Sequence, residues 1–380
     1  MLRFLHTADW QIGRQYSRFD PDDAAMLADA RYVAVQRLAR LAGEEQVAAV
    51  LVAGDIFDAQ TLSDRTLHRT FQAMSAFSGP WVMLPGNHDA ALAESIWTRA
   101  ERIGAMPANV HLLTTPEVFV LEDAGAAILP APLTQRQTHH DLSVWFDNAE
   151  THKGAIRIGL AHGSVEGQLP ESADSPNPIA ADRATTAKLD YLALGDWHGL
   201  KRINARTWYS GTPEQERFKD NGAGQALLVE IDSPGDEPRV TPCEIGQHRW
   251  YQWQRQIHVA SDLDALLTEL AALPAMSVID LTLSGELDLA GQQCLEQALG
   301  AAAGRHRSLQ THLGGLALVP TAEDIAALQA DGYVGNVISE LQQQQQGGDA
   351  QADTARQALG ILARLLGDQR SAADAPESQS

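Results

Sequence analysis

The feature that most constrains this sequence is a short apolar run ending in polar side chains that can bind metal, and it occurs five times. The runs cover residues 2–6, 47–53, 81–84, 156–161 and 191–194. Continuous apolar runs of this length are typical of strands buried on both faces. The clusters that follow them are, in chain order, Asp9-Trp10-Gln11, Gly54-Asp55, Gly86-Asn87-His88-Asp89, His162-Gly163 and Gly195-Asp196-Trp197-His198.

Helical patterns lie between these runs. Residues 22–41 begin with two acidic residues and then place apolar side chains three and four positions apart, at Leu27, Ala30, Ala34, Leu38 and Leu41, which predicts an amphipathic helix. Further apolar runs cover residues 126–129 and 225–231. Buried strands alternating with helices predict an α/β fold, with layered sheets covered by helices, over residues 1–240.

The pattern changes after a turn-rich segment at residues 233–238. Residues 248–340 predict a smaller α+β domain, with strands at 251–259, 277–284 and 309–318 and helices at 262–273 and 289–303. This segment holds 4 Arg and no Lys against 11 acidic residues. Such a charge balance argues against a nucleic-acid surface there.

The C-terminal part has a different composition. Residues 341–354 are rich in Gln and Gly and predict a flexible linker. Residues 355–380 follow, with a short amphipathic helix at 358–366 and a polar tail at 371–380. A terminal helix after a linker either packs on its own domain or docks on a partner, and the sequence leaves both open.

Overall composition excludes several classes of protein. The formal net charge of −21 argues against a protein that coats nucleic acid, but bound cations allow an acidic nuclease. The two cysteines, Cys243 and Cys294, are too few for a disulfide framework or a thiolate metal site. The sequence shows neither a membrane-spanning run nor a good signal peptide, so we expect a cytoplasmic protein.

The polar clusters predict a metal centre. Ligands of α/β folds collect outside the carboxyl ends of the strands, so the five clusters can converge in one crevice. Carboxylate, amide and imidazole donors suit manganese, magnesium, iron or zinc. Each cluster alone is explained as well by a turn or a helix cap. All five together favour a pair of metal ions with one bridging carboxylate.

The order of these motifs resembles the calcineurin-like metallophosphoesterase superfamily. More narrowly, residues 6–10 (His-Thr-Ala-Asp-Trp), residues 54–58 (Gly-Asp-Ile-Phe-Asp) and the added α+β domain resemble its DNA-repair exonuclease branch. That branch contains SbcD-type nuclease subunits. The resemblance implies a layered metallophosphoesterase β-sandwich flanked by helices, with a smaller α+β capping domain.

The resemblance also implies roles for individual residues. Asp55 would bridge two divalent ions. Asp9 and His198 would hold the first ion, and the second would be held by Asn87, His162 and Asp196. His88 would protonate or stabilise the leaving oxygen, and Asp89 would orient His88.

Two positions depart from the usual pattern. Gln11 and Asp196 each stand where the resemblance leads us to expect His. An amide oxygen replaces an imidazole nitrogen at Gln11, and Asp196 adds a carboxylate. Both changes favour hard ions, so we expect Mn²⁺, with Mg²⁺ or Fe²⁺ as alternatives.

The functional prediction is a two-metal phosphodiesterase that acts on DNA, as an exonuclease and in some cases an endonuclease, in double-strand-break repair. The resemblance implies an SbcC-like coiled-coil ATPase as partner, docked through residues 355–367, and a homodimer. One alternative is a small-molecule or nucleotide phosphodiesterase or phosphatase. The other is a non-catalytic assembly subunit with a structural metal site.

Nearby residues suggest how DNA would be held. Cations close to the clusters either contact phosphates or form a solvated rim: Arg14, Arg18, Lys201, Arg202, Arg217 and Lys219. Trp10 and Trp197 either stack on bases or pack beneath the metals. Residues 209–217 resemble a closing element beside the active site, to which we assign positioning.

Overall fold

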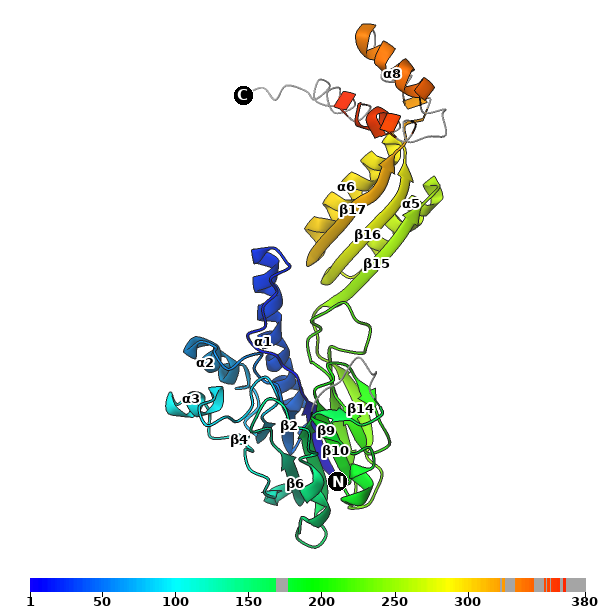
Figure 1. Cartoon of the computed structure of the whole chain (residues 1–380). Helices are drawn as coiled ribbons and strands as arrows, with labels where there is room; N and C mark the ends of the chain where they lie inside the picture. Colours follow the sequence, from blue (N-terminus) through cyan, green and yellow to red (C-terminus); the bar gives the residue numbers. More distant parts are fainter. Residues whose placement is uncertain are drawn as a thin grey trace. The chain divides into compact units, whose positions relative to one another are not determined.

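The computed structural model describes residues 1–168, 177–321, 323–324, 332–344, 352, 354–355, 357–362 and 365–366. Two compact units divide the chain, the first covering Met1–His248 and the second Arg249–Ser380. Figure 1 shows the elements of both units.

The first unit contains two six-stranded sheets. The strands of the first sheet are, in spatial order, β14 (Arg239–Glu244), β13 (Gln225–Ile231), β1 (Leu2–Thr7), β2 (Ala49–Ala53), β3 (Trp81–Leu84) and β4 (Val110–Leu112). Those of the second are β11 (Lys201–Arg202), β12 (Thr207–Tyr209), β10 (Tyr191–Gly195), β7 (Ile156–His162), β6 (Ala126–Ala131) and β5 (Phe119–Leu121). The short strands β8 (Ser164–Val165) and β9 (Pro178–Ile179) pair separately.

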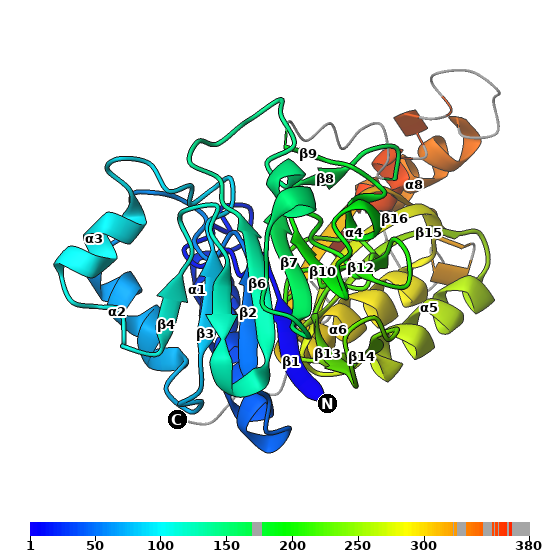
Figure 2. The same cartoon turned by 90° about the horizontal axis from the view of Figure 1, so that it is seen from below.

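Three buried clusters define the layers of this unit. Side chains of β1, β2 and β3 meet those of β6, β7 and β10 in a core between the two sheets. The outer face of the first sheet packs on three helices, α1 (Pro21–Glu44), α2 (Asp64–Ala73) and α3 (Ile96–Arg102). The outer face of the second sheet packs on α4 (Arg183–Thr186) and on η2 (Val144–Asn148). Figure 2 shows α1, α2 and α3 beside β2, β3 and β4. The predicted α/β sandwich flanked by helices is therefore confirmed.

Helix α1 illustrates how the sequence sets this layer. Pro21 lies in its first turn with Asp22 and Asp23, which favour a helix start. Its apolar face is buried against the first sheet through Leu27, Ala34 and Leu38 among others. The helix therefore forms because one face is covered, as its spacing predicts.

Strand direction brings the polar clusters together. β1, β2 and β3 run parallel, and so do β7 and β10. The carboxyl ends of the first three strands therefore meet at one edge of the first sheet, and those of β7 and β10 meet at one edge of the second. The ends of β2 and β7 touch, because Nδ1 of His162 lies 2.8 Å from the carbonyl oxygen of Ala53.

The second unit contains a three-stranded parallel sheet, β15 (Arg249–Ile257), β16 (Ser277–Leu287) and β17 (Ser308–Leu318). Two helices, α5 (Ala260–Ala272) and α6 (Leu289–Arg305), join these strands and pack on the sheet through a leucine-rich core. The elements lie within a few residues of the ranges expected from the sequence. Parallel strands joined by helices are the βαβ arrangement.

A helix outside the elements expected above follows in the second unit. Helix α8 (Gly332–Gln344) extends into the segment expected to be a linker from residue 341. Glutamine has a favourable helix propensity, so a Gln-rich segment continues a helix that has already started. Residues 357–362 are helical and overlap the helix expected at 358–366, and the polar tail at 371–380 lies outside the described residues. In the described part of the chain, no helix combines the length and the apolar character needed to cross a membrane.

Candidate metal centre

Two loops that follow β1 and β2 form the floor of the candidate site. The amide of Asp9 donates to the carbonyl oxygen of Gly54 at 3.0 Å, and the amide of Gln11 donates to that of Asp55 at 3.0 Å. The loops therefore run side by side, and Gln11 Nε2 donates to Asp55 Oδ2 at 2.8 Å. Asp9, Gln11 and Asp55 are all at most 1% exposed.

The backbone is strained at the same positions. Asp9, Gln11, Asp55 and Asp196 have φ angles of 52°, 49°, 53° and 96°. Residues with a Cβ rarely adopt this region, and such strain clusters at functional sites. The packed strands therefore hold these side chains in a conformation that an isolated loop would avoid.

The second sheet contributes ligands from the opposite side. His162 Nε2 lies 2.9 Å from Asn87 Oδ1, 3.6 Å from Asp55 Oδ1 and 3.7 Å from Asp196 Oδ1. The amide of Asp196 donates to Asp9 Oδ1 at 3.0 Å. Ligand atoms of Asp9, Asp55 and His162 all lie within 4.8 Å of one another. Residues far apart in the sequence thus share one buried pocket.

Two glycines make this close approach possible. A Cβ on Gly54, whose φ is +90°, would lie 2.2 Å from His162 Nδ1. A Cβ on Gly86 would lie 2.2 Å from Asp55 Oδ1. Any larger residue at either position would displace a predicted ligand.

His88 and Asp89 have different surroundings. The His88 amide donates to Asp55 Oδ1 at 2.9 Å, and Nδ1 of its ring lies 2.8 Å from the carbonyl oxygen of Asp58. The imidazole is 40% exposed, and its Nε2 is 3.9 Å from Asp55 Oδ2. The Asp58 carbonyl therefore orients the ring.

The carboxylate of Asp89 does not take the orienting role expected for it. Asp89 accepts hydrogen bonds from the amides of Gly86 at 2.6 Å and Phe57 at 3.1 Å, and it is fully buried. It joins the loops after β2 and β3, because two buried amide donors need an acceptor there. Asp89 is thus a structural part of the loop that carries Asn87 and His88.

Crowding of carboxylates shifts the pKa values at the site. Burial raises the pKa of Asp9 to about 6. Burial, reinforced by the charge of Asp55, raises the pKa of Asp89 to about 7. Burial disfavours protonated His162, but Asp55, Asp196 and Asp9 outweigh it and raise the pKa of His162 to about 9. A cluster of this kind is balanced by positive charge, which divalent ions supply.

His198 is held by Glu216, a carboxylate within the expected closing element at residues 209–217. Its Nδ1 contacts Glu216 Oε1, and Glu216 also forms ion pairs with Arg31 at 2.9 Å and with Arg14 at 3.0 Å. Arg217 lies 2.6 Å from the same carboxylate and 2.6 Å from His198 Nδ1. Burial would raise the pKa of Glu216, but His198, Arg31 and Arg14 outweigh it and hold that pKa well below its usual value.

The donor set fits divalent metal ions. Gln11 Oε1 is buried and has no hydrogen-bond partner among the described residues, although buried polar atoms are normally paired. This amide oxygen lies in a pocket of carboxylate and imidazole donors, the set that manganese and magnesium prefer. The candidate ligands are Asp9, Gln11, Asp55, Asn87, His162, Asp196 and His198.

The tryptophans pack differently from one another. Trp10 is 1% exposed and makes an edge contact with Trp81, so it cannot stack on a base. Trp197 is half-buried, and the ammonium groups of Lys219 and Lys201 lie 4.2 Å and 5.6 Å from its ring. Both lysines therefore make cation–π contacts with the Trp197 ring.

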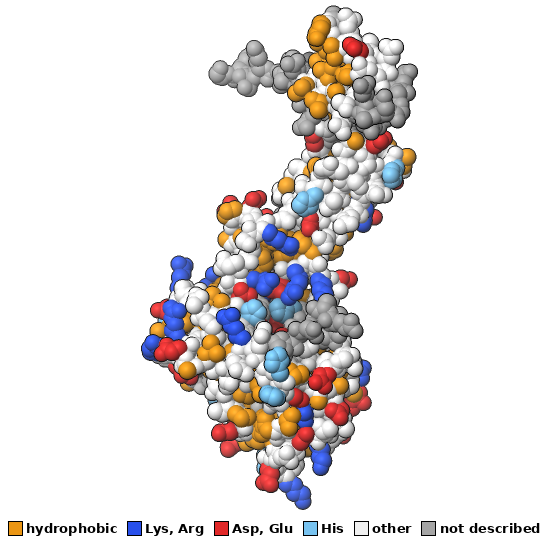
Figure 3. Space-filling view, viewed as in Figure 1, with side chains coloured by type: hydrophobic (Ala, Val, Ile, Leu, Met, Phe, Trp, Pro, Cys, Tyr) orange, Lys and Arg blue, Asp and Glu red, His pale blue; other side chains and the backbone are white. Residues whose placement is uncertain are grey.

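The remaining cations are also paired. Arg202 lies over the ring of Trp208 and pairs with Glu237 at 3.6 Å. Arg18 lies over the rings of Phe19 and Phe218. In Figure 3, Lys and Arg side chains gather beside His and acidic side chains on this face of the first unit. The rim of the candidate site is therefore locally basic on an acidic chain.

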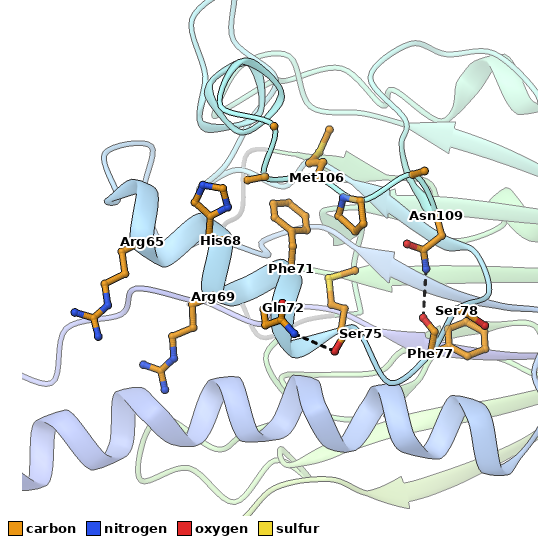
Figure 4. A pocket seen from close by; sticks show the side chains of 15 residues that line it. Arg65, His68, Arg69, Phe71, Gln72, Ser75, Phe77, Ser78, Met106 and Asn109 are labelled. Carbon is orange, nitrogen blue, oxygen red and sulfur yellow. Dashed lines mark hydrogen bonds between the residues drawn. The ribbon is translucent and has the colours of Figure 1, made fainter.

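A separate hollow of about 1060 Å³ lies along α2. Figure 4 shows Arg65, His68 and Arg69 projecting from the helix at one end, with Asn109 at the other. Its floor is apolar, through Phe71 and other buried side chains. The described residues that line it include no Asp, Glu or Cys, so it lacks the donor set of the candidate metal centre.

Comparison with known proteins gives a consistent assignment. The calcineurin-like phosphoesterase family matches residues 2–222. The SbcD component of nuclease SbcCD from Bacillus subtilis (strain 168) is 25% identical over 272 residues, which cover 62% of this chain and 68% of that protein. The uncharacterized metallophosphoesterase YhaO of the same strain is 25% identical over 244 residues, covering 60% of this chain and 57% of YhaO.

A third relative is archaeal. The DNA double-strand break repair protein Mre11 of Methanosarcina acetivorans is 24% identical over 258 residues, which cover 62% of this chain and 38% of that protein. The fold, together with these matches, defines a metal-dependent phosphoesterase. The chain belongs to the calcineurin-like phosphoesterase family, as the sequence motifs predicted.

Proposed function

We propose that this protein is a two-metal phosphodiesterase that hydrolyses DNA in double-strand-break repair, acting as an exonuclease and also as an endonuclease. The observation that carries the proposal is the buried convergence of Asp9, Asp55 and His162, with Asn87 and Asp196 beside them. The relatives named as a component of a nuclease and as a DNA double-strand break repair protein support DNA as the substrate.

In this proposal each ligand has a defined place. Asp55 would be shared by two ions, Asp9, Gln11 and His198 would hold the first, and Asn87, His162 and Asp196 would hold the second. When bound, the ions neutralise phosphate charge and make a water molecule nucleophilic near neutral pH. Hard oxygen donors favour Mn²⁺, with Mg²⁺ or Fe²⁺ as alternatives.

His88 supplies the proton in this reaction. Its Nδ1 faces the Asp58 carbonyl, so Nε2 is the nitrogen left for the substrate. In the protonated ring, Nε2 donates its proton to the leaving oxygen as the P–O ester bond breaks. The half-exposed position of the ring gives a phosphodiester access to it.

Cations at the rim would contact the DNA backbone. Arg14 and Arg217 pair with Glu216, the carboxylate that contacts His198. Lys201 and Lys219 lie over the Trp197 ring. Phosphate contacts of this kind position a strand without reading its sequence. Arg202, committed to Glu237, is assigned a peripheral contact.

The proposal includes partners and a location. An SbcC-like ATPase would dock on residues 355–367, where Ile361 and Leu365 are 62% and 57% exposed. Deleting these residues should abolish co-purification with such an ATPase and leave diester hydrolysis intact. A homodimer, to be tested by light scattering, and a cytoplasmic location remain predictions.

The test is a digestion panel with Mn²⁺. Single-stranded, double-stranded and hairpin DNA are compared with cyclic and linear nucleotides and with bis-nitrophenyl phosphate, using wild-type protein and Asp55→Asn. The proposal is supported if the wild-type protein cleaves DNA and if Asp55→Asn abolishes both DNA cleavage and metal binding.

The same panel separates the alternatives. Similarity to YhaO, an uncharacterized metallophosphoesterase, keeps a nucleotide or small-molecule phosphodiesterase as the second candidate. That candidate predicts cleavage of nucleotides and intact DNA. Tight Mn²⁺ binding without hydrolysis of any ester would instead indicate an assembly subunit with a structural metal site.

A further inference from the structure

Glu216 is the meeting point of three arginines and a histidine from different parts of the first unit. Its carboxylate contacts His198 after β10, Arg14 after β1, Arg31 on α1 and its neighbour Arg217. The side chain is 1% exposed. A buried carboxylate with this many charged partners has a fixed position.

Arg31 extends this arrangement to the loop that carries two candidate ligands. Its side chain is 1% exposed, and it donates to the carbonyl oxygen of Trp10 at 2.6 Å and to the Tyr16 hydroxyl at 2.9 Å. Trp10 lies between Asp9 and Gln11. Arg31 therefore fixes the backbone from which both of these side chains project.

The candidate ligands of the first ion come from two different sheets. Asp9 and Gln11 follow β1 of the first sheet, whereas His198 follows β10 of the second. The Arg31–Glu216 pair joins them, with Arg31 holding the Trp10 carbonyl and Glu216 holding His198 Nδ1. The contact at Nδ1 leaves Nε2 of His198 as the ring nitrogen for a metal.

We propose that Glu216 is a positioning residue for the first metal ion, acting through His198 and Arg31. This inference rests on the proposed function, because it assumes that two ions bind. Removing a carboxylate that orients a metal-binding histidine typically lowers metal affinity by about 10- to 100-fold.

The second ion should not depend on Glu216. His162 is oriented by the Ala53 carbonyl oxygen at 2.8 Å, and Asn87 lies against His162 at 2.9 Å. These contacts do not pass through the Arg31–Glu216 pair. A role in positioning therefore predicts a selective loss of one ion, whereas a role in general folding predicts no such selectivity.

The experiment is a calorimetric titration of the full-length, metal-free chain with Mn²⁺. Wild-type protein should show two binding events. Glu216→Gln should weaken one of them by about 10- to 100-fold and leave the other within threefold of wild type. Glu216→Asp, which keeps the charge, should give an intermediate affinity. Glu230→Gln is the matched control, because Glu230 pairs with Arg3 at 2.7 Å on β1 and β13.

A second variant protects the test against misfolding. Glu216→Gln leaves Arg31 buried without its carboxylate, so circular dichroism is measured first. The double variant Arg31→Met/Glu216→Gln removes both charges, and it should show the same selective loss. The inference is overturned if every folded Glu216 variant binds both ions with wild-type affinity, or loses both equally. Wild-type protein that binds no Mn²⁺ would instead overturn the proposed function.

Discussion

The side-chain amide of Gln11 donates a 2.8 Å hydrogen bond to Asp55 Oδ2, and its own carbonyl oxygen stays buried without a partner among the described residues. One atom of Gln11 thus fixes the proposed bridging carboxylate, and the other is available to a cation. An amide oxygen is a harder donor than imidazole, so this position should influence which metal binds.

Replacing Gln11 by His should change metal preference. The imidazole nitrogen suits Zn²⁺ better than an amide oxygen does, so Gln11→His should raise affinity for Zn²⁺ relative to Mn²⁺ by about tenfold. Competition titrations of the two ions measure the ratio. A ratio equal to that of wild type would show that Gln11 does not face a metal.

Substitution of His88 should separate metal binding from turnover. His88→Ala removes the proposed acid but none of the proposed ligands, so Mn²⁺ affinity should stay within threefold of wild type. Turnover should fall by about 10²- to 10⁴-fold. His68→Ala, an exposed histidine on α2, is the control and should keep full activity. Unchanged turnover in His88→Ala would exclude His88 as the acid.

Asp89 should matter for stability. Asp89→Ala leaves the buried amides of Gly86 and Phe57 without their acceptor. The free energy of unfolding should fall by about 1–3 kcal/mol, as measured by urea denaturation of the metal-free protein. Unchanged stability combined with lost turnover would instead return Asp89 to a direct role with His88.

His6 should make the fold sensitive to acid. Burial lowers the pKa of His6 to about 3 from its ordinary value of 6.5. Between these two pH values His6 is protonated in the unfolded chain and neutral in the folded chain. The contribution of neutral His6 to the free energy of unfolding is therefore present above pH 6.5 and is lost as the pH falls toward 3.

The variant His6→Gln removes this titration. Between pH 6.5 and 4.5, wild type should lose about 2 kcal/mol more unfolding free energy than His6→Gln does. Urea denaturation in the presence of a chelator measures both proteins, and the subtraction cancels shared titrations. Equal losses would mean that His6 is not buried in its neutral form.

The strands, the first helix and the positions of the polar clusters could be predicted from the sequence because their signals are local. An apolar run followed by Gly-Asp marks a strand end wherever it lies. Parallel strands then bring such ends together, so Asp9, Asp55 and His162 meet although no local signal joins them.

The contacts around the ligands could not be predicted in this way. Arg31 and Glu216 are separated by 185 positions, and no local sequence pattern indicates that these two side chains pair. Trp10 and Asp89 lie within motifs, yet tertiary packing turns Trp10 into the core and Asp89 toward backbone amides. Helix α8 was not predicted, although Tyr333, Val334, Val337, Ile338 and Leu341 repeat with helical spacing.

The most direct test of the central claim is a crystal structure grown with Mn²⁺ and measured at the manganese absorption edge. We predict two anomalous peaks about 3.5–4 Å apart, with Asp55 between them and Asp9, His198, Asn87, His162 and Asp196 around them. A map with no peak among these side chains in excess Mn²⁺, or with peaks only elsewhere on the chain, would contradict the two-metal site.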